Sequence, residues 1–109
     1  MSLNKIHIIG RVGKDPESIT TKSGDVMTKF SVAVSDKYNG EERTQWFNCK
    51  AFKYSATYIL NNVQKGTQVY IEGSMQSNKY EEKTYWDLIT SKVLVLDGRK
   101  AQDDSGKGY

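Results

Sequence analysis

The sequence predicts an all-β domain in which five strands form a small barrel and one short helix follows the third strand. Two observations carry this prediction. Apolar and polar residues alternate along several separate segments, which is the period of half-buried strands, and only one segment has apolar residues at helical spacing. The chain of 109 residues, of which 37% are hydrophobic, fits one domain with one hydrophobic core.

The first strand is predicted over Lys5–Val12, where Ile6 and Ile8 share one face with Val12. Gly10 lies inside this strand, and a glycine in that position often marks a bulge or a bend. The glycine, aspartate and proline that follow break the alternation and end the strand.

The second strand has the clearest alternation in the chain and runs from Val26 to Ser35. A turn over Lys22–Asp25 precedes it. The polar segment 36–43 follows and contains Asn39-Gly40, so we predict a hairpin loop there.

The third strand is predicted over Thr44–Phe52 and the helix over Ser55–Val63. Ser55 is a suitable N-cap, because its hydroxyl can accept from a free backbone N–H. Lys65-Gly66 is a suitable helix end, because a cation and a glycine are favoured at that terminus.

The last two strands are predicted over Thr67–Met75 and Thr84–Leu96, the latter with a kink near Ser91-Lys92, and a polar hairpin around residues 81–83 separates them. Five strands with a helix between the third and the fourth is the order of the OB-fold, a partly open Greek-key barrel. A five-stranded sandwich is the competing fold, and the position of the helix favours the barrel. We therefore expect an OB-fold domain over residues 1–96 and a disordered tail over residues 97–109.

The third strand carries the residues from which a function can be inferred. One of its faces is apolar, with Phe47, Cys49 and Ala51, and belongs in a core or an interface. The other face places two aromatic rings at the ends of a row, with an amide and a cation between them. This row consists of Trp46, Asn48, Lys50 and Phe52.

Such a mixture of rings and cations suits single-stranded nucleic acid. A fixed ring stacks on any base, which contributes about 1–3 kcal/mol per base and tolerates sequence, and a lysine between rings can contact the linking phosphate. Tyr38 and Tyr80 lie in the two polar hairpins, beside Lys37 and Lys79, where a ring is poorly placed to fill a core. The alternative is structural, since a tryptophan on a strand belongs to a core more often than to a ligand platform. The other aromatic residues, assigned to packing, are Tyr54, Tyr58, Tyr70, Tyr85 and Trp86.

Composition argues against an enzyme, a metal site and a membrane span. The formal net charge of +3 permits a nucleic-acid partner without requiring one. Cys49 is the only cysteine and His7 the only histidine, and no nucleophile–base arrangement or phosphate loop is recognisable. No apolar stretch is long enough to cross a membrane. We expect no catalysis, no metal, no cofactor and a reducing, cytoplasmic setting.

Several short stretches, in a fixed order and spacing, match those of a known family. They are Asn4–Arg11, Asp15–Glu17, Phe30–Ser35, Thr44–Trp46, Phe52-Lys53 and, as the most specific, Lys65–Gly73. With these stretches the chain resembles the bacterial and phage single-stranded DNA-binding proteins of the replication machinery, over residues 4–96.

The resemblance implies a mode of binding and of assembly. Family members wrap single strands around an OB-fold oligomer, so a homotetramer is expected, with a dimer as the alternative. Lys65 and Lys79 match basic positions near the path of the strand. The family often has tryptophan at two stacking positions where this chain has tyrosine, so stacking is retained with less contact area. The stacking positions correspond to Tyr38, Trp46, Phe52 and Tyr80.

Two departures from the family pattern concern the tail and the subunit contact. Family tails end in an acidic tip that recruits replication and repair proteins, whereas the stretch from Asp97 to Tyr109 has three acidic and three basic residues. We expect either a shortened chain or a member that lacks this recruitment. Phe47 stands where some relatives carry a histidine between subunits, so the detail of the assembly stays open.

Pattern and resemblance together predict non-sequence-specific binding and protection of single-stranded DNA in replication, recombination and repair, in a bacterial or phage-infected cell. Two alternatives stay open. One is a primosome-type OB-fold adaptor that acts mainly through protein contacts, and the other is an OB module that prefers RNA by sensing the sugar 2′-hydroxyl. The cations expected to contact phosphates are Lys50, Lys65, Lys79, Arg11 and Lys5.

Overall fold

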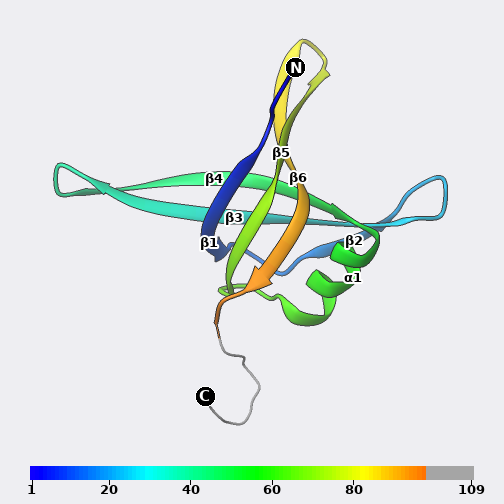
Figure 1. Cartoon of the computed structure of the whole chain (residues 1–109), viewed down its shortest axis with the longest axis horizontal. Coiled ribbons are helices and arrows are strands. Elements are labelled where there is room, and N and C mark those ends of the chain that lie inside the picture. Colours follow the sequence, from blue (N-terminus) through cyan, green and yellow to red (C-terminus); the bar gives the residue numbers. More distant parts are fainter. Residues whose placement is uncertain (98–109) are drawn as a thin grey trace, which may run out of the picture.

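The computed structural model describes residues 1–97 as a β-domain with one helix (Figure 1). Its elements are β1 (Ile6–Val12), β2 (Glu17–Thr20), β3 (Val26–Tyr38), β4 (Glu41–Phe52), α1 (Lys53–Asn62), β5 (Gln68–Tyr80) and β6 (Lys83–Val95). Among the described residues, no helix combines the length and the apolar character needed to cross a membrane.

The strands form one sheet that closes on itself. Their order is β1-β5-β6-β4-β3-β2, and an additional pairing of β1 with β3 completes the barrel. The pairing of β4 with β6 is parallel, with Cys49 opposite Leu88, and the other pairings are antiparallel. The predicted five-stranded barrel, with its helix between the third and the fourth barrel strand, is confirmed. The short β2 is an additional strand, which alternation could not reveal because all four of its residues are exposed.

The core lies inside the barrel and consists mainly of the apolar faces of the five barrel strands, β1, β3, β4, β5 and β6, as alternation requires. Cys49 and Ala51 of β4 are buried in it, and Phe47 packs against it partly buried, as predicted. The helix α1 contributes the buried Ile59 and closes one end of the barrel. The remaining buried members are Ile8, Val12, Phe30, Val32, Val63, Val69, Ile71 and Leu88.

Gly10 marks a close approach of two strands without a shift in register, whereas the predicted kink near Ser91-Lys92 is a bulge. At Gly10, β1 passes close to β3, so that an added Cβ would lie 2.3 Å from the carbonyl oxygen of Ala33. In the β5–β6 ladder the register shifts by one residue, because Glu72 pairs with Lys92 while Gly73 pairs with Thr90. Ser91, which lies between Thr90 and Lys92 on β6, is therefore the bulge residue, and it lies at the predicted kink.

Three hairpins project from the barrel as arms (Figure 1). The prediction of a loop over 36–43 is wrong, because β3 continues to Tyr38 and β4 starts at Glu41. Only Asn39-Gly40 forms the turn, with φ of 53° and 83°, the signature of a type I′ hairpin turn. Both faces of the ribbon are exposed beyond the barrel, so its residues are polar. Without an apolar face, these segments lack the alternation that predicts a strand.

The helix starts earlier than predicted and without the predicted cap. It begins at Lys53, directly after β4, and Phe52 is the extended N-cap residue, with no side-chain cap from Ser55. Lys53 has a φ of 57°, so the chain changes direction there rather than in a connecting loop. The helix ends at Asn62. The predicted disordered tail covers residues 97–109, and all of it except Asp97 lies outside the described residues.

Candidate nucleic-acid interface

A groove of about 750 Å³ lies on the outer face of the barrel, over β3, β4 and β6 and beside the β5–β6 hairpin. The loop after β1 contributes Lys14 and Asp15, and β2 contributes Glu17. The β3 and β4 strands contribute Lys29, Phe30, Ser31, Asn48, Cys49 and Lys50, and the hairpin contributes Asn78, Tyr80, Tyr85 and Asp87.

The predicted row on β4 faces outward. Trp46 is 60% exposed and Phe52 is 38% exposed, whereas the residues of opposite parity are buried or half-buried. Asn48 and Lys50 lie between the two rings and line the groove. The outward orientation of both rings is confirmed, and the two rings flank the groove without lining it.

The β5–β6 hairpin places two tyrosines in the groove, of which one was predicted. Tyr80 lines the groove, and so does Tyr85, which pairs with Asn78 across the hairpin. The assignment of Tyr85 to packing is therefore wrong. Its spacing could have indicated this, because in a two-residue hairpin it shares a face with Tyr80.

The opposite face of this hairpin carries another exposed aromatic ring. Trp86 is 56% exposed and pairs with Ser77, while Lys79 pairs with Thr84. Because successive residues alternate between faces, Trp86 and Lys79 point away from Tyr80 and Tyr85. Lys79 does not line the groove, and its contact with DNA stays a prediction.

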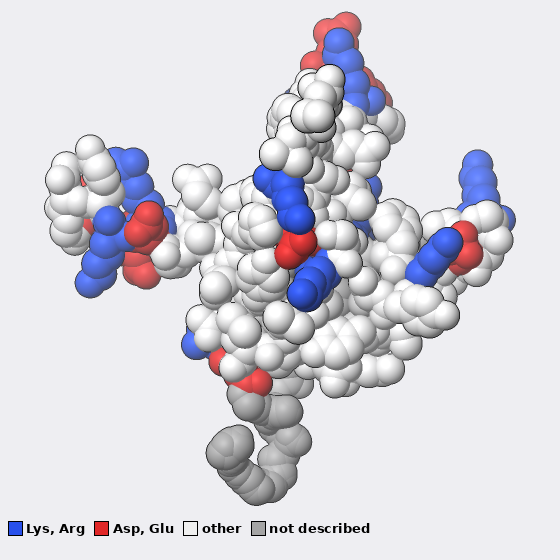
Figure 2. Space-filling model, viewed as in Figure 1, with Lys and Arg blue, Asp and Glu red and all other residues white. Residues whose placement is uncertain are grey.

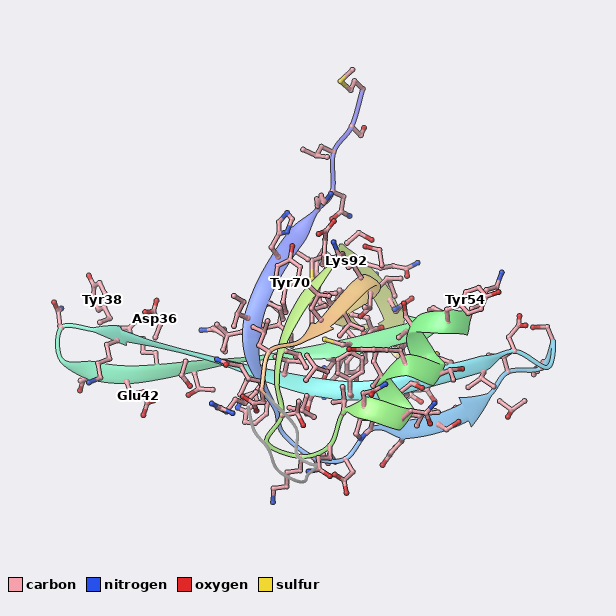
Figure 3. All side chains as sticks on the ribbon, turned by 60° about the horizontal axis from the view of Figure 1, so that its bottom comes forward. Asp36, Tyr38, Glu42, Tyr54, Tyr70 and Lys92 are labelled. Carbon is pink, nitrogen blue, oxygen red and sulfur yellow. The ribbon has the colours of Figure 1, made fainter. Side chains whose placement is uncertain are left out.

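The assignment of the helix tyrosines to packing is also wrong. Tyr54 is 92% exposed and lies at the start of α1 (Figure 3), and Tyr58 is exposed as well. Both rings lie on the exposed side of the helix, whereas Ala56 and Ile59 are its buried residues. Tyr70, in contrast, is partly buried: its hydroxyl donates to Oε1 of Glu72 (2.8 Å) and lies 2.7 Å from Nδ1 of His7.

Tyr38 lies at the end of the β3–β4 arm (Figure 3). Trp46 pairs with Ala33 in the ladder, and Tyr38 is an odd number of residues further along β3, so the two rings belong to opposite faces of the ribbon. The guanidinium of Arg43 lies over the ring of Tyr38, with Cζ 4.7 Å from the ring centroid, in a cation–π contact. The structure therefore does not bring Tyr38 to the row of Trp46, although its ring is exposed.

The floor of the groove carries two adjacent cations. Lys29 of β3 and Lys50 of β4 are directly paired across the ladder. Nζ of Lys50 is 3.1 Å from Oδ2 of Asp87 on β6. Lys65, predicted to contact phosphate, is exposed just beyond the groove, and its backbone N–H donates to Oδ1 of Asp15 (2.8 Å). Lys29 was not predicted from the sequence, because it is one of several polar residues in its strand and has no aromatic neighbour on the same face.

Lys5 and Arg11 do not line the groove, and both already pair with carboxylates. Nζ of Lys5 is 3.0 Å from Glu72, and Nη1 of Arg11 is 3.1 Å from Asp97. The hydrogen bond from Lys5, followed by that from Tyr70, lowers the pKa of Glu72. Contact of Lys5 and Arg11 with DNA stays a prediction.

On the face that Figure 2 shows, basic and acidic residues are interspersed, both on the projecting arms and over the barrel. Figure 2 shows Lys and Arg at the ends of the hairpins, with Asp and Glu among them. This distribution agrees with the modest net charge of +3. The groove itself is lined by three cationic, three acidic and three aromatic residues, which are Lys14, Lys29 and Lys50, Asp15, Glu17 and Asp87, and Phe30, Tyr80 and Tyr85.

A model of the single-strand binding protein family matches residues 3–97. The chain belongs to this family. Among its relatives in the single-strand binding protein family, a "Single-stranded DNA-binding protein" of Neisseria meningitidis serogroup A is 36% identical over 119 residues, which cover 100% of this chain and 68% of the relative. "Single-stranded DNA-binding protein 1" of Staphylococcus aureus strain COL is 30% identical over 113 residues, which cover 96% of this chain and 68% of the relative.

A solved structure described as "Plasmodium falciparum SSB complex with ssDNA" has the same architecture as this single-strand binding family member. The TM-score is 0.82 and the sequence identity 28%, with 89% of this chain and 97% of the other chain covered. The likeness confirms the OB-fold predicted from the sequence.

Proposed function

We propose that this protein binds single-stranded DNA with little sequence preference and protects it in replication, recombination and repair. The observation that carries the proposal is the outward row of β4, in which Trp46 and Phe52 flank Asn48 and Lys50 on the face of the groove. The family and the names of its members support the same ligand.

The proposed mechanism has two parts. Bases stack on Trp46, Phe52, Tyr80 and Tyr85, because unpaired bases expose flat faces that duplex DNA hides. Phosphates between the stacked bases contact Lys29 and Lys14 in the groove and Lys65 just beyond it, which makes binding weaker at higher salt. Neither part needs a reacting group, so we propose a binding protein rather than an enzyme.

We further propose that the protein assembles with copies of itself, as a tetramer or a dimer. Ile9, Tyr70 and Leu94 pair in a row across β1, β5 and β6. Ile9 and Leu94 are exposed although they are apolar. An exposed apolar row on the flat outer face of a sheet is typical of a protein interface. The bacterial relatives also suggest a cytoplasmic setting, in a bacterial or phage-infected cell.

A fluorescence titration with dT oligomers of increasing length, at two salt concentrations, tests the proposal. We expect quenching of tryptophan fluorescence, saturation at a defined length and weaker binding at the higher salt. Duplex DNA of the same length is the control for charge alone, and oligo(U) tests for an RNA preference. Equal affinity for duplex and single strands would contradict the stacking mechanism. Binding of a protein partner without any single-strand binding would favour the adaptor.

A further inference from the structure

Three carboxylates line the groove, although a site for a polyanion would be expected to hold only cations and neutral groups. Those of Asp15 and Glu17 are exposed to water, whereas that of Asp87 is not. Asp87 lines the groove, and its side chain is only 13% exposed. It belongs to β6, next to Lys50 on the paired strand β4. A fixed negative charge repels phosphate, so this carboxylate requires an explanation if the groove binds DNA.

The carboxylate is held in place through one of its two oxygens. Oδ2 of Asp87 is 3.1 Å from Nζ of Lys50 and accepts a hydrogen bond of 2.8 Å from Nδ2 of Asn78. Within residues 1–97, no hydrogen bond or ion pair reaches Oδ1. The carboxylate is therefore oriented by two donors, and Oδ1 remains available as an acceptor for a ligand.

The surroundings determine which part of a strand can meet Oδ1. Tyr80 and Tyr85 line the same groove and offer rings on which a base can stack. Lys50 is already paired, so the uncommitted cation of the floor is Lys29, one strand further from Asp87. Phosphate is thus favoured toward Lys29, and a stacked base is left to present its edge to Asp87.

We propose that Asp87 reads the edge of a bound base and gives the groove a preference for bases with an exocyclic amino group, with cytosine favoured over thymine among the pyrimidines. This inference rests on the proposed single-strand binding. A carboxylate accepts well from the N4 amino group of cytosine. The only ring N–H of thymine lies between two carbonyl oxygens, which the carboxylate repels.

Titration of the wild-type protein with dC and dT oligomers of one length, compared with Asp87→Asn, tests the inference. Both oligomers are pyrimidines, so differences in stacking area are small. Removing the charge relieves the repulsion of thymine and of phosphate, while cytosine loses its charged acceptor. We expect the ratio of dC affinity to dT affinity to fall roughly three- to ten-fold in the variant.

Glu17→Gln is the matched control, because it removes one negative charge from an exposed position in the same groove. We expect it to tighten the binding of both oligomers equally. If Asp87→Asn also shifts both oligomers equally, the carboxylate acts only on the overall charge and the inference is overturned. If the wild-type protein binds neither oligomer, it is the proposed function that fails.

Asn78→Ala provides a second test that does not depend on the stability of the Asp87 variant. It leaves the charge of the groove unchanged but removes the amide that orients the carboxylate. We expect the preference for dC over dT to weaken in this variant, with the salt dependence of binding retained. An unchanged preference would contradict the role assigned to the oriented carboxylate.

Discussion

Gly13 and Trp46 are in direct contact: a Cβ atom added to Gly13 would lie 2.5 Å from Cζ3 of the Trp46 ring. Gly13 is itself fixed, because its N–H donates to the carbonyl oxygen of Ser31 (3.0 Å). One edge of the exposed ring is therefore seated on the backbone of the loop after β1. A ring supported in this way loses little conformational freedom when a base stacks on it.

Gly13→Ala should weaken single-strand binding while leaving the fold intact. The backbone at Gly13 does not have the left-handed φ that would strain an alanine, so the added methyl group displaces the ring and, less strongly, the Ser31 hydroxyl, which would lie 3.0 Å from it. A displaced ring loses part of a stacking contact of about 1–3 kcal/mol, so we expect a several-fold loss of affinity with a nearly unchanged Tm. Fluorescence titration and a thermal melt measure the two quantities. Unchanged affinity would show that the seating of the ring is irrelevant to binding.

The sequence predicted the orientation of this ring, because strand alternation is a local property. Trp46 has a parity opposite to that of the buried Cys49, and nothing beyond β4 is needed to infer it. The contact with Gly13 could not be predicted. It joins a residue of the loop after β1 to a residue of β4, and β1 and β4 do not pair with one another, so it depends on the path of that loop.

The groove itself was predictable only in part, for the same reason. Asn48 and Lys50 follow from the parity of β4, whereas the neighbourhood of Lys50 and Asp87 arises from the parallel pairing of β4 with β6. That pairing is between strands far apart in the sequence, so no local pattern reveals it. The β3–β4 arm was mispredicted as a loop because polar residues on both of its faces hide the strand period.

The two tryptophans form a natural matched pair for testing the binding face. Both are about equally exposed, but Trp46 lies on the groove face and Trp86 on the opposite face of its hairpin. Trp46→Ala should reduce the affinity for oligo(dT) by about ten-fold or more, since it removes one stacking platform. Trp86→Ala should leave the affinity close to that of the wild-type protein. Equal losses of affinity in the two variants would mean that DNA also contacts the face of the β5–β6 hairpin that carries Trp86, which contradicts the proposed path.

Gly73→Ala should destabilise the barrel strongly. An added Cβ would lie 2.0 Å from the carbonyl oxygen of Ile89 on the paired strand, so backbone atoms would have to move apart. Overpacking of this kind costs about 1–3 kcal/mol or more. Urea unfolding measures the change, with Ser74→Ala on the neighbouring residue as the control. A Gly73 variant as stable as the control would show that the barrel can open locally without cost.

The pH dependence of stability should include a contribution from Cys49. Burial, followed by the charge of Asp87, raises the pKa of the Cys49 thiol to about 12 from its ordinary value of 9.0. The folded state therefore favours the neutral thiol. The stabilisation is fully present below pH 9.0 and is lost as the pH rises toward 12.

Urea unfolding between neutral pH and pH 10.5 can detect this contribution, with the window chosen about the ordinary thiol pKa. The free energy of unfolding should fall with rising pH more steeply in the wild-type protein than in Cys49→Ala, which lacks the thiol. The native thiol should also react slowly with a disulfide reagent at pH 8, a value typical for such assays. Rapid reaction of the native protein would contradict the burial of Cys49.

Ile9→Glu should separate assembly from folding. Ile9 is exposed at the centre of β1 and lies beside Tyr70 in the sheet. A charge there costs the folded monomer little, because the side chain already faces water, but it must be desolvated if a second copy covers the row. We expect a lower mass in solution by light scattering, with an unchanged circular dichroism spectrum. Thr57→Glu, on the exposed face of α1, is the control for an added charge elsewhere. If Ile9→Glu and the control have the same mass as the wild-type protein, the interface lies on another surface.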